Sequence, residues 1–181
     1  GSVPWLFAKK NLVHFQVPFT GVNHRPWLNK LKLSRATIIC NSQFTQRFIN
    51  QEFGIKSKVL YPPVAVDQFK PGRKEKVILY VGRFTDLLHH KRQDVLVEAF
   101  AKLVRCSEAK DWRLVLIGSD QEGKELVKKL KKMSEKLPVE IKTNLNFTQL
   151  KKEYACSTFF WGAAGFGIDE NKNPAGVEHF G

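Results

Sequence analysis

The chain has 181 residues, of which 30 are Lys or Arg and 17 are Asp or Glu, so its formal net charge is +13. Hydrophobic residues make up 43% of it, which is too many for a disordered chain. The three cysteines, Cys40, Cys106 and Cys156, are too few to staple a secreted miniprotein and too far apart for a zinc ribbon. The sequence has no apolar run long enough to span a bilayer, and we expect a soluble, intracellular protein of one or two domains.

The positive charge predicts an anionic partner, which could be nucleic acid, a lipid surface or a phosphorylated small molecule. Part of it has a simpler explanation. Lysines at 128, 129, 131, 132 and 136 alternate with Leu126, Leu130 and Met133, which is the pattern of a helix with a solvated polar face.

The first third of the chain has short elements. Residues 13–18 read as a strand, residues 21–27 as a loop, and residues 35–40 as a buried strand. A helix should follow, capped by Asn41 or Ser42 and ended by Gly54. Residues 58–61 read as another strand, and the proline-containing stretch 62–72 as a linker or domain junction.

From residue 77 the pattern becomes regular. Apolar runs predict strands at 77–82, 112–118, 139–141 and 157–161, with helices at 92–105 and 126–137 between them. Thr148 is expected to cap a short helix before the last strand. Strict alternation of strands and helices predicts an α/β fold with a Rossmann-like parallel sheet.

Ligands of such sheets bind beyond the carboxyl ends of the strands, which selects the segments after Val81, Ile117 and Trp161. After Val81 come Gly82 and Arg83, and Lys91 stands at the start of the next helix. Glycine lets a ligand approach the backbone, and an arginine fork, a lysine charge and a helix N-terminus all suit phosphate oxygens. This pattern favours a diphosphate site, although surface cations are common in so basic a chain.

The other two strand ends give weaker signals. Gly118 reads as a tight turn, and the glycines of residues 162–167 run in the reverse order of a dinucleotide fingerprint. A ligand loop lined by backbone, with Phe166 and Gly167 in it, suits that segment better. His89 and His90 are adjacent, so they do not share a helix face as a metal pair would, and we expect both to be exposed. Spacing supports neither a carboxylate pair nor a Ser-His-Asp set.

Several motifs in order resemble the family 4 glycosyltransferases of GT-B fold. They are Cys40-Asn41-Ser42-Gln43-Phe44-Thr45, Tyr61-Pro62-Pro63-Val64 with Asp67 and Phe69, Val81-Gly82-Arg83-Phe84, His90-Lys91-Arg92-Gln93-Asp94, Leu116-Ile117-Gly118 and Glu178-His179-Phe180-Gly181. The resemblance covers residues 35–181, and among the branches of the family the chain is similar to mannosyltransferases.

The resemblance implies a domain order. Residues 1–60 would be the end of the acceptor-side Rossmann-like domain, residues 61–75 the interdomain linker, and residues 76–181 the nucleotide-sugar domain. The implied reaction is retaining transfer of a hexosyl group, mannosyl by branch similarity, from a nucleoside diphosphate sugar to a glycan or lipid-linked acceptor. No metal or other cofactor and no nucleic acid would take part. The protein would be cytoplasmic, with peripheral contact at the cytoplasmic face of a membrane.

The resemblance also implies residue roles. Arg83 and Lys91 would hold the donor diphosphate, and Glu178 would contact the donor sugar and ribose, which makes these three the expected catalytic residues. Gly82, Gly118, Phe166 and Gly167 would complete the donor site. The donor base and sugar stay open, and the loop 144–147 is a candidate for reading the base.

Two departures from the family pattern lead to a further expectation. The second glutamate of the pair that Glu178 opens would follow Gly181, and the glycine-rich acceptor loop has no counterpart. We therefore expect an internal fragment of a longer enzyme that is inactive and poorly soluble in isolation. Two alternatives remain open at this point: a basic nucleic-acid-binding protein, and a GT-B relative such as a sugar-nucleotide epimerase or a phosphorylase.

Overall fold

The computed structural model describes residues 3–85 and 91–180. The chain divides into two compact units, one made of residues 1–64 and 167–181 and the other of residues 65–166. The first unit thus combines both ends of the chain. This division differs from the expected ranges 1–60, 61–75 and 76–181, and the assignment of those ranges to acceptor-side domain, linker and donor domain stays a prediction. No helix of the described residues is long and apolar enough to cross a bilayer.

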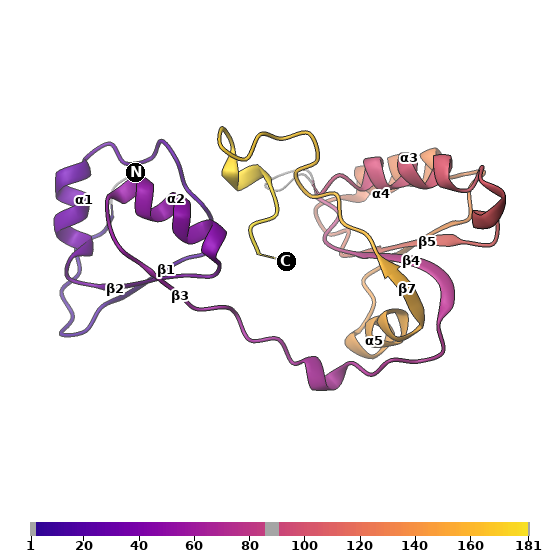
Figure 1. The fold of residues 1–181 in the computed structure, drawn as a ribbon, viewed down its shortest axis with the longest axis horizontal. Helices are drawn as coiled ribbons and strands as arrows, with labels where there is room; N and C mark the ends of the chain where they lie inside the picture. Colours follow the sequence, from indigo (N-terminus) through magenta and orange to yellow (C-terminus); the bar gives the residue numbers. More distant parts are fainter. Residues whose placement is uncertain (1–2, 86–90, 181) are drawn as a thin grey trace. The chain divides into compact units, whose positions relative to one another are not determined.

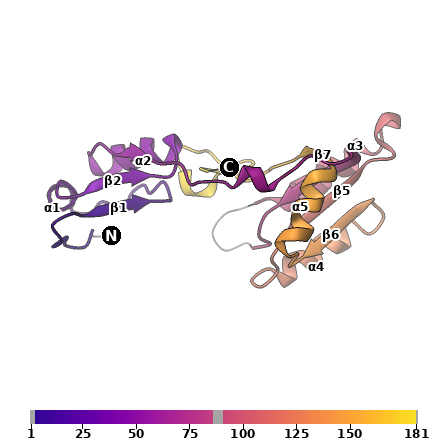
Figure 2. The same ribbon diagram turned by 90° about the horizontal axis from the view of Figure 1, so that it is seen from below.

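Unit 1 contains a small parallel sheet in the order β1-β2-β3. The strands are β1 (Leu12–Phe15), β2 (Thr37–Cys40) and β3 (Lys58–Val59), and its helices are α1 (Pro26–Leu33) and α2 (Gln43–Phe53). Figure 2 shows α2 lying over β1 and β2. The core lies on one face of the sheet, where Ile38 and Cys40 meet Leu33 of α1 and Ile49 and Phe53 of α2.

The ends of α2 are as the sequence predicts. Ser42 is its N-cap, and the Ser42 side chain accepts a hydrogen bond from the Thr45 amide. Gly54 ends the helix in the left-handed conformation, with φ of 61°. The expected loop over residues 21–27 was wrong at its end, because α1 begins at Pro26. Proline fits the first helical turn, because backbone N–H groups there have no acceptor within the helix and the N–H that proline lacks is not needed.

Unit 2 contains a four-stranded parallel sheet in the order β6-β5-β4-β7. Its elements in chain order are β4 (Glu75–Val81), α3 (Gln93–Leu103), β5 (Arg113–Gly118), α4 (Lys124–Met133), β6 (Val139–Thr143), α5 (Phe147–Cys156) and β7 (Ser157–Phe160). The Rossmann-like α/β fold with parallel pairing is therefore confirmed. One short 3-10 turn, Val66–Gln68, lies within the stretch expected to be a linker.

Both faces of the β4–β5 pair are buried. Ile78 and Tyr80 pack with Phe100 and other side chains of α3 and α4, while Val77 and Leu79 pack toward Leu150 and Tyr154 of α5. Figure 1 shows α3 and α4 on one side of the sheet and α5 on the other. Successive side chains of a strand point to opposite faces, so a continuous apolar run is required when helices cover both.

The predicted cap of α5 was wrong. Asn146 caps the helix, because its side chain accepts from the Gln149 amide while the Gln149 side chain accepts from the Asn146 amide. This reciprocal capping box satisfies two backbone donors, whereas Thr148 lies inside the first turn.

Candidate functional site

The strand order of unit 2 places a topological switch point between β4 and β7. From β4 the chain moves outward through β5 to β6, then returns through α5 to β7 on the other side of β4. Because α3 and α5 lie on opposite faces, the connections diverge between β4 and β7. Open α/β sheets bind ligands at such a switch point. The segments that border it are residues 82–85 and residues 161–166.

The turn after β4 is packed tightly against the turn after β5. The Gly82 amide donates to the Ile117 carbonyl at 2.8 Å, and the Phe84 amide donates to the Ser119 carbonyl at 3.0 Å. A Cβ on Gly118 would come closer than 3.0 Å to the Gly82 carbonyl oxygen, and one on Gly82 would come that close to the Tyr80 hydroxyl. The structure thus gives both glycines a packing role, and their contact with a donor stays a prediction.

Arg83 is exposed, and its backbone is anchored by a buried side chain that we did not predict. The Gln93 side chain is 2% exposed and donates to the Arg83 carbonyl at 3.0 Å and to the Tyr80 hydroxyl at 3.3 Å. Gln93 stands on the apolar face of α3, four residues before Val97 and seven before Phe100. A polar residue at an apolar-face position is the sequence signal that could have identified it.

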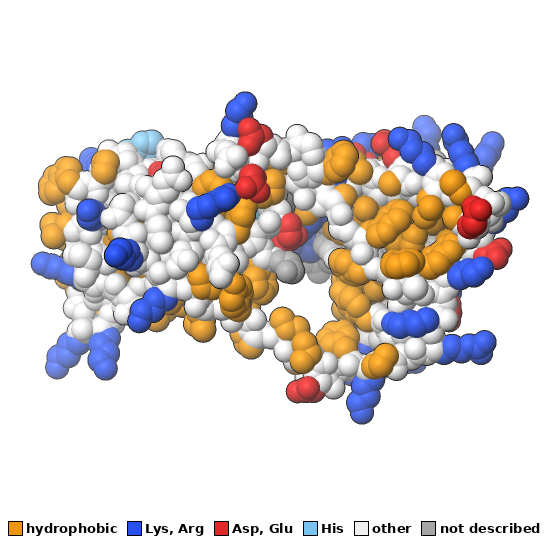
Figure 3. Space-filling model, viewed as in Figure 1, with side chains coloured by type: hydrophobic (Ala, Val, Ile, Leu, Met, Phe, Trp, Pro, Cys, Tyr) orange, Lys and Arg blue, Asp and Glu red, His pale blue; other side chains and the backbone are white. Residues whose placement is uncertain are grey.

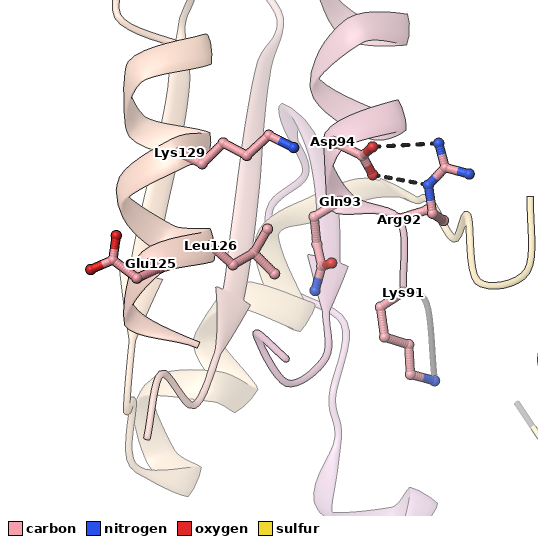
Figure 4. Close-up of a pocket in the computed structure, with 7 residues that line it drawn as sticks. All are labelled: Lys91, Arg92, Gln93, Asp94, Glu125, Leu126 and Lys129. Carbon is pink, nitrogen blue, oxygen red and sulfur yellow. Dashed lines mark hydrogen bonds and ion pairs between the residues drawn. The ribbon is translucent and has the colours of Figure 1, made fainter. Parts of the chain in front are cut away.

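Lys91 lines a pocket of about 270 Å³ between the beginnings of α3 and α4. The other lining residues are Arg92, Gln93, Asp94, Glu125, Leu126 and Lys129. Figure 4 shows Lys91 pointing away from the pair formed by Arg92 and Asp94, while Lys129 points toward Asp94. The pocket gathers three cations and two carboxylates at the start of an eleven-residue helix.

Arg92 ties the loop after β7 to the start of α3. Its Nη1 donates to the Phe166 carbonyl at 2.8 Å, and its Nε donates to Asp94 at 3.1 Å. The residue holds the left-handed conformation, with φ of 51°. This backbone is uncommon for a residue with a side chain and persists where the surroundings enforce it.

The ion pair also acts on Asp94. Burial favours the neutral carboxyl, but the hydrogen bonds from Arg92 and from the Val95 amide outweigh it and hold the pKa of Asp94 below its ordinary value. Asp94 is therefore ionised at neutral pH, and it keeps Arg92 oriented toward the Phe166 carbonyl. The sequence analysis gave Arg92 no role of its own beyond its place in a motif. No local sequence signal relates Arg92 to Phe166, which lies 74 residues further along the chain.

The loop after β7 turns tightly, and its predicted role in lining a ligand site stays a prediction. The Phe166 amide donates to the Ala163 carbonyl at 3.0 Å, and the Phe166 ring is 61% exposed. Gly165 and Gly167 have φ of 76° and 82°, which glycine adopts without strain. Gly167 begins the second segment of unit 1, so Phe166 and Gly167 belong to different units.

Glu178 also lies in unit 1, whereas Arg83 and Lys91 lie in unit 2. Its side chain is exposed, and its neighbour His179 is fixed to α2, because the Ser42 hydroxyl donates to the His179 carbonyl at 2.5 Å. The three expected catalytic residues are thus not gathered within one unit. His89 and His90 lie outside the described residues, among which no group of three or more His, Cys, Asp or Glu could hold a metal ion.

Comparison with known proteins gives the class. The family model described as glycosyl transferases group 1 matches residues 65–159, more than half of the chain. The chain therefore belongs to the group 1 glycosyl transferases, and such a domain implies binding of a nucleotide-sugar donor and an acceptor. The match includes Gly82, Arg83, Lys91 and Gly118, and it ends before Phe166, Gly167 and Glu178. No curated protein matches the chain.

Proposed function

We propose that the chain acts in retaining transfer of a hexosyl group from a nucleoside diphosphate sugar, with the donor diphosphate held at the carboxyl ends of β4 and β7. The observation that carries the proposal is the position of Arg83 and Lys91. Arg83 follows β4, one of the two strands at the switch point, and Lys91 precedes α3, in a domain that the group 1 glycosyl transferase model matches. The similarity to family 4 mannosyltransferases supports a mannosyl donor and a glycan or lipid-linked acceptor at the cytoplasmic face of a membrane.

The chemistry requires positive charge at this place. When the glycosidic bond to the donor phosphate breaks, the leaving nucleoside diphosphate gains negative charge. An arginine fork and a lysine charge stabilise it, and the positive end of the α3 dipole adds to their effect. Arg83 is suited to the task because its side chain is exposed while Gln93 fixes its carbonyl. In this proposal the fixed cations need no metal ion to assist them.

The remaining roles follow the resemblance. Glu178 would contact the donor sugar and ribose, and the backbone at Phe166 and Gly167 would line the donor site beside Gly82 and Gly118. The two left-handed glycines of the loop support a backbone-lined wall.

The test is calorimetric titration of the 181-residue chain with UDP-, GDP- and ADP-sugars, with and without a chelator. We expect binding of one nucleotide, about tenfold or more weaker in Arg83→Ala and in Lys91→Ala, because each change removes a charge-assisted phosphate contact. The chelator should leave the dissociation constant unchanged.

Matched controls come from the opposite edge of the same sheet. Arg73 precedes β4 and Lys110 precedes β5, and both are exposed. Arg73→Ala and Lys110→Ala remove the same charges and should not change the affinity. Equal losses of nucleotide affinity in all four variants would mean that only net charge matters, which would contradict the proposed site. The proposal would also be contradicted if the wild-type chain is folded by circular dichroism but binds none of the nucleotides.

A further inference from the structure

The two edges of the unit 2 sheet differ in how they are protected from other chains. Strand β6 forms one edge and strand β7 forms the other. On β6, Lys142 pairs with Glu140 at 3.2 Å, and Glu140 also pairs with Arg113 of β5. Charged side chains on an edge strand oppose pairing with a further strand, because the approach would remove water from them. The β6 edge is therefore protected.

Strand β7 lacks this protection. Residues 154–168 contain no Asp, Glu, Lys or Arg, and this is the longest such stretch in the chain. The strand and the residue that follows it read Ser157-Thr158-Phe159-Phe160-Trp161, which combines high β-propensity with the absence of charge and proline. Within residues 3–85 and 91–180, β4 is the only strand that pairs with β7. An uncharged edge of this kind can pair with a strand of another chain.

The backbone of β7 directs hydrogen-bonding groups toward its outer side. The Trp161 amide donates to the Leu79 carbonyl of β4 at 2.9 Å. Successive residues of a strand direct their backbone N–H and C=O groups to opposite sides, so those of Thr158 and Phe160 face away from β4. A strand added at the outer side of β7 would accept and donate at these two residues.

The side chains of β7 leave aromatic surface exposed on both faces of the sheet. Phe159 is 54% exposed and stacks on Trp112, with ring centres 5.2 Å apart. Phe160 points to the opposite face, is 55% exposed and stacks on Tyr154 at 6.1 Å. Figure 3 shows hydrophobic side chains gathered over this region of unit 2, between the positions of α3 and α5 in Figure 1. Parallel sheets normally have both faces covered, so this surface suits a partner.

A cavity of about 460 Å³ adjoins β7 on the face of Phe159. Leu103, Trp112 and Trp161 are among its lining residues, and Leu103 is the last residue of α3. The cavity thus lies where the cover provided by α3 ends. An aromatic side chain from a partner would bury apolar surface there.

We propose that β7 pairs with β7 of a second copy of this chain, antiparallel across a twofold axis. The two Phe160 residues then lie opposite each other and exchange both backbone hydrogen bonds. In this register Phe159 lies beside the partner's Trp161, next to the cavity, and the two four-stranded sheets become continuous. The carboxyl ends of the two β7 strands point in opposite directions, so the inference does not depend on the proposed donor site.

Charge and area favour a second copy as the occupant. Each copy has a net charge of +13, so two copies repel each other except where they meet at an uncharged surface such as residues 154–168. Phe159 and Phe160 each expose roughly 100 Å², so the four rings of a dimer supply about 400 Å². With the strand backbones and neighbouring rings, the interface approaches about 1,000 Å², which suits a specific but weak dimer. Because the pairing uses the β7 edge of both copies and the β6 edge is protected, assembly stops at two copies.

The test is sedimentation velocity of the 181-residue chain from low to high micromolar concentration. We expect a reversible equilibrium of monomer and dimer with a micromolar dissociation constant. Phe160→Lys places two like charges opposite each other and should weaken dimerisation roughly a hundredfold. Phe160→Thr keeps the β-propensity but removes the ring, and it should weaken dimerisation about tenfold.

Matched variants separate the β7 edge from general stickiness. Leu12 is 65% exposed on β1, an edge strand of the other sheet, and Leu12→Lys should dimerise as the wild type does. Phe147 is a 49% exposed aromatic residue of α5, and Phe147→Lys should also leave the dissociation constant unchanged. Circular dichroism verifies that each variant is folded.

Amide hydrogen exchange locates the interface within the wild-type chain. The Phe160 amide should exchange more slowly as the concentration rises, because it becomes bonded in the dimer. The Trp161 amide is already bonded to β4 and should not change.

The proposal would be overturned by a chain that stays monomeric at every concentration, or by assemblies that grow beyond two copies. It would also be overturned if Phe160→Lys dimerised as the wild type does, or if exchange of the Phe160 amide did not depend on concentration. Nucleotide titration at concentrations where the wild type is monomeric tests the donor site alone, so the failure of one proposal is distinguishable from the failure of the other.

Discussion

The two parallel sheets of this chain differ in how completely their faces are covered. In unit 2, Val77, Ile78 and Leu79 are each 1% exposed, because helices lie on both sides of β4. In unit 1, the core cluster lies on one face of the sheet, and Leu12 of β1 is 65% exposed. Ile39, on the other face of β2, is 8% exposed, so the exposed apolar surface of this sheet lies at its edge strand β1. The β4–β5 pair, covered on both faces, can hold a rigid polar site at its carboxyl ends, whereas an exposed edge strand leaves apolar surface accessible.

The comparison also concerns the loops at the strand ends. After β4 and β5, glycines let two turns approach within backbone contact, and Gln93 and Arg92 connect those turns to α3 and to the loop after β7. In unit 1, the corresponding anchor is Ser42, which caps α2 and donates to the His179 carbonyl. Both units therefore use a helix start to hold a loop distant in sequence.

The largest expected effect comes from breaking the close packing in unit 2. In Gly118→Ala the new methyl group meets the Gly82 carbonyl, so we expect the free energy of unfolding to fall by about 2–3 kcal/mol in chemical denaturation. A Cβ added at Gly162 would have no heavy atom within 4 Å. Gly162→Ala should therefore change the free energy of unfolding by less than about 0.5 kcal/mol. Similar values for the two variants would mean that the two turns are not rigidly packed.

A smaller effect is expected from freeing the loop after β7. Arg92→Ala removes both the bond to the Phe166 carbonyl and the pair with Asp94, and we expect about tenfold weaker nucleotide binding because the loop is no longer held. Arg92→Lys keeps the positive charge but lacks the guanidinium group that bonds Asp94 and the Phe166 carbonyl together, so it should restore little of the nucleotide affinity. Exposed Arg105 lies beyond the other end of α3, so Arg105→Ala is the control. Full affinity in Arg92→Ala would show that the loop does not border the nucleotide.

The smallest effect concerns pH. Burial favours the neutral form of Glu140, but hydrogen bonds from Arg113 and Lys142 outweigh it and lower its pKa. The pKa of Glu140 is lower in the folded protein than in the unfolded chain. The ion pairs of Glu140 therefore stabilise the fold fully above the ordinary glutamate pKa, and this stabilisation is lost as pH falls through the folded-state pKa. It should amount to less than about 1 kcal/mol, since Glu140 is partly exposed.

Thermal unfolding of unit 2 as a function of pH tests this ion-pair contribution. Glu140→Gln should flatten the acidic part of the stability curve, whereas Glu135→Gln, at an exposed position just after α4, should leave it unchanged. An identical acid dependence in wild type and Glu140→Gln would contradict the assigned role.

Local patterns predicted most of the elements, and they failed where a residue type has two uses. Strands β4 and β5 were predictable because a strand pair covered on both faces requires continuous apolar runs. Helix α1 was missed because Pro26 was taken as a loop residue, although proline also begins helices. Asn146 and Thr148 can both cap a helix, and only the reciprocal bonds with Gln149 decide between them.

The candidate site was predictable in part for a related reason. The positions of Arg83 after a strand and of Lys91 before a helix were predictable, because the order of elements along the sequence establishes them. The role of Arg92 depends on Phe166, and that of Ser42 on His179, 137 positions later. Such bonds arise from tertiary structure, and one sequence gives no local sign of them.

The central claim is that the carboxyl edge of the unit 2 sheet binds a diphosphate. The most direct measurement is the change in backbone amide NMR signals when the nucleoside diphosphate selected by calorimetry is added to the ¹⁵N-labelled chain. We predict the largest shifts at residues 82–84, 91–96 and 162–166, with residues 73–76 at the opposite edge unchanged. Shifts confined to unit 1, or centred on residues 73–76 and 110–113, would contradict the claim.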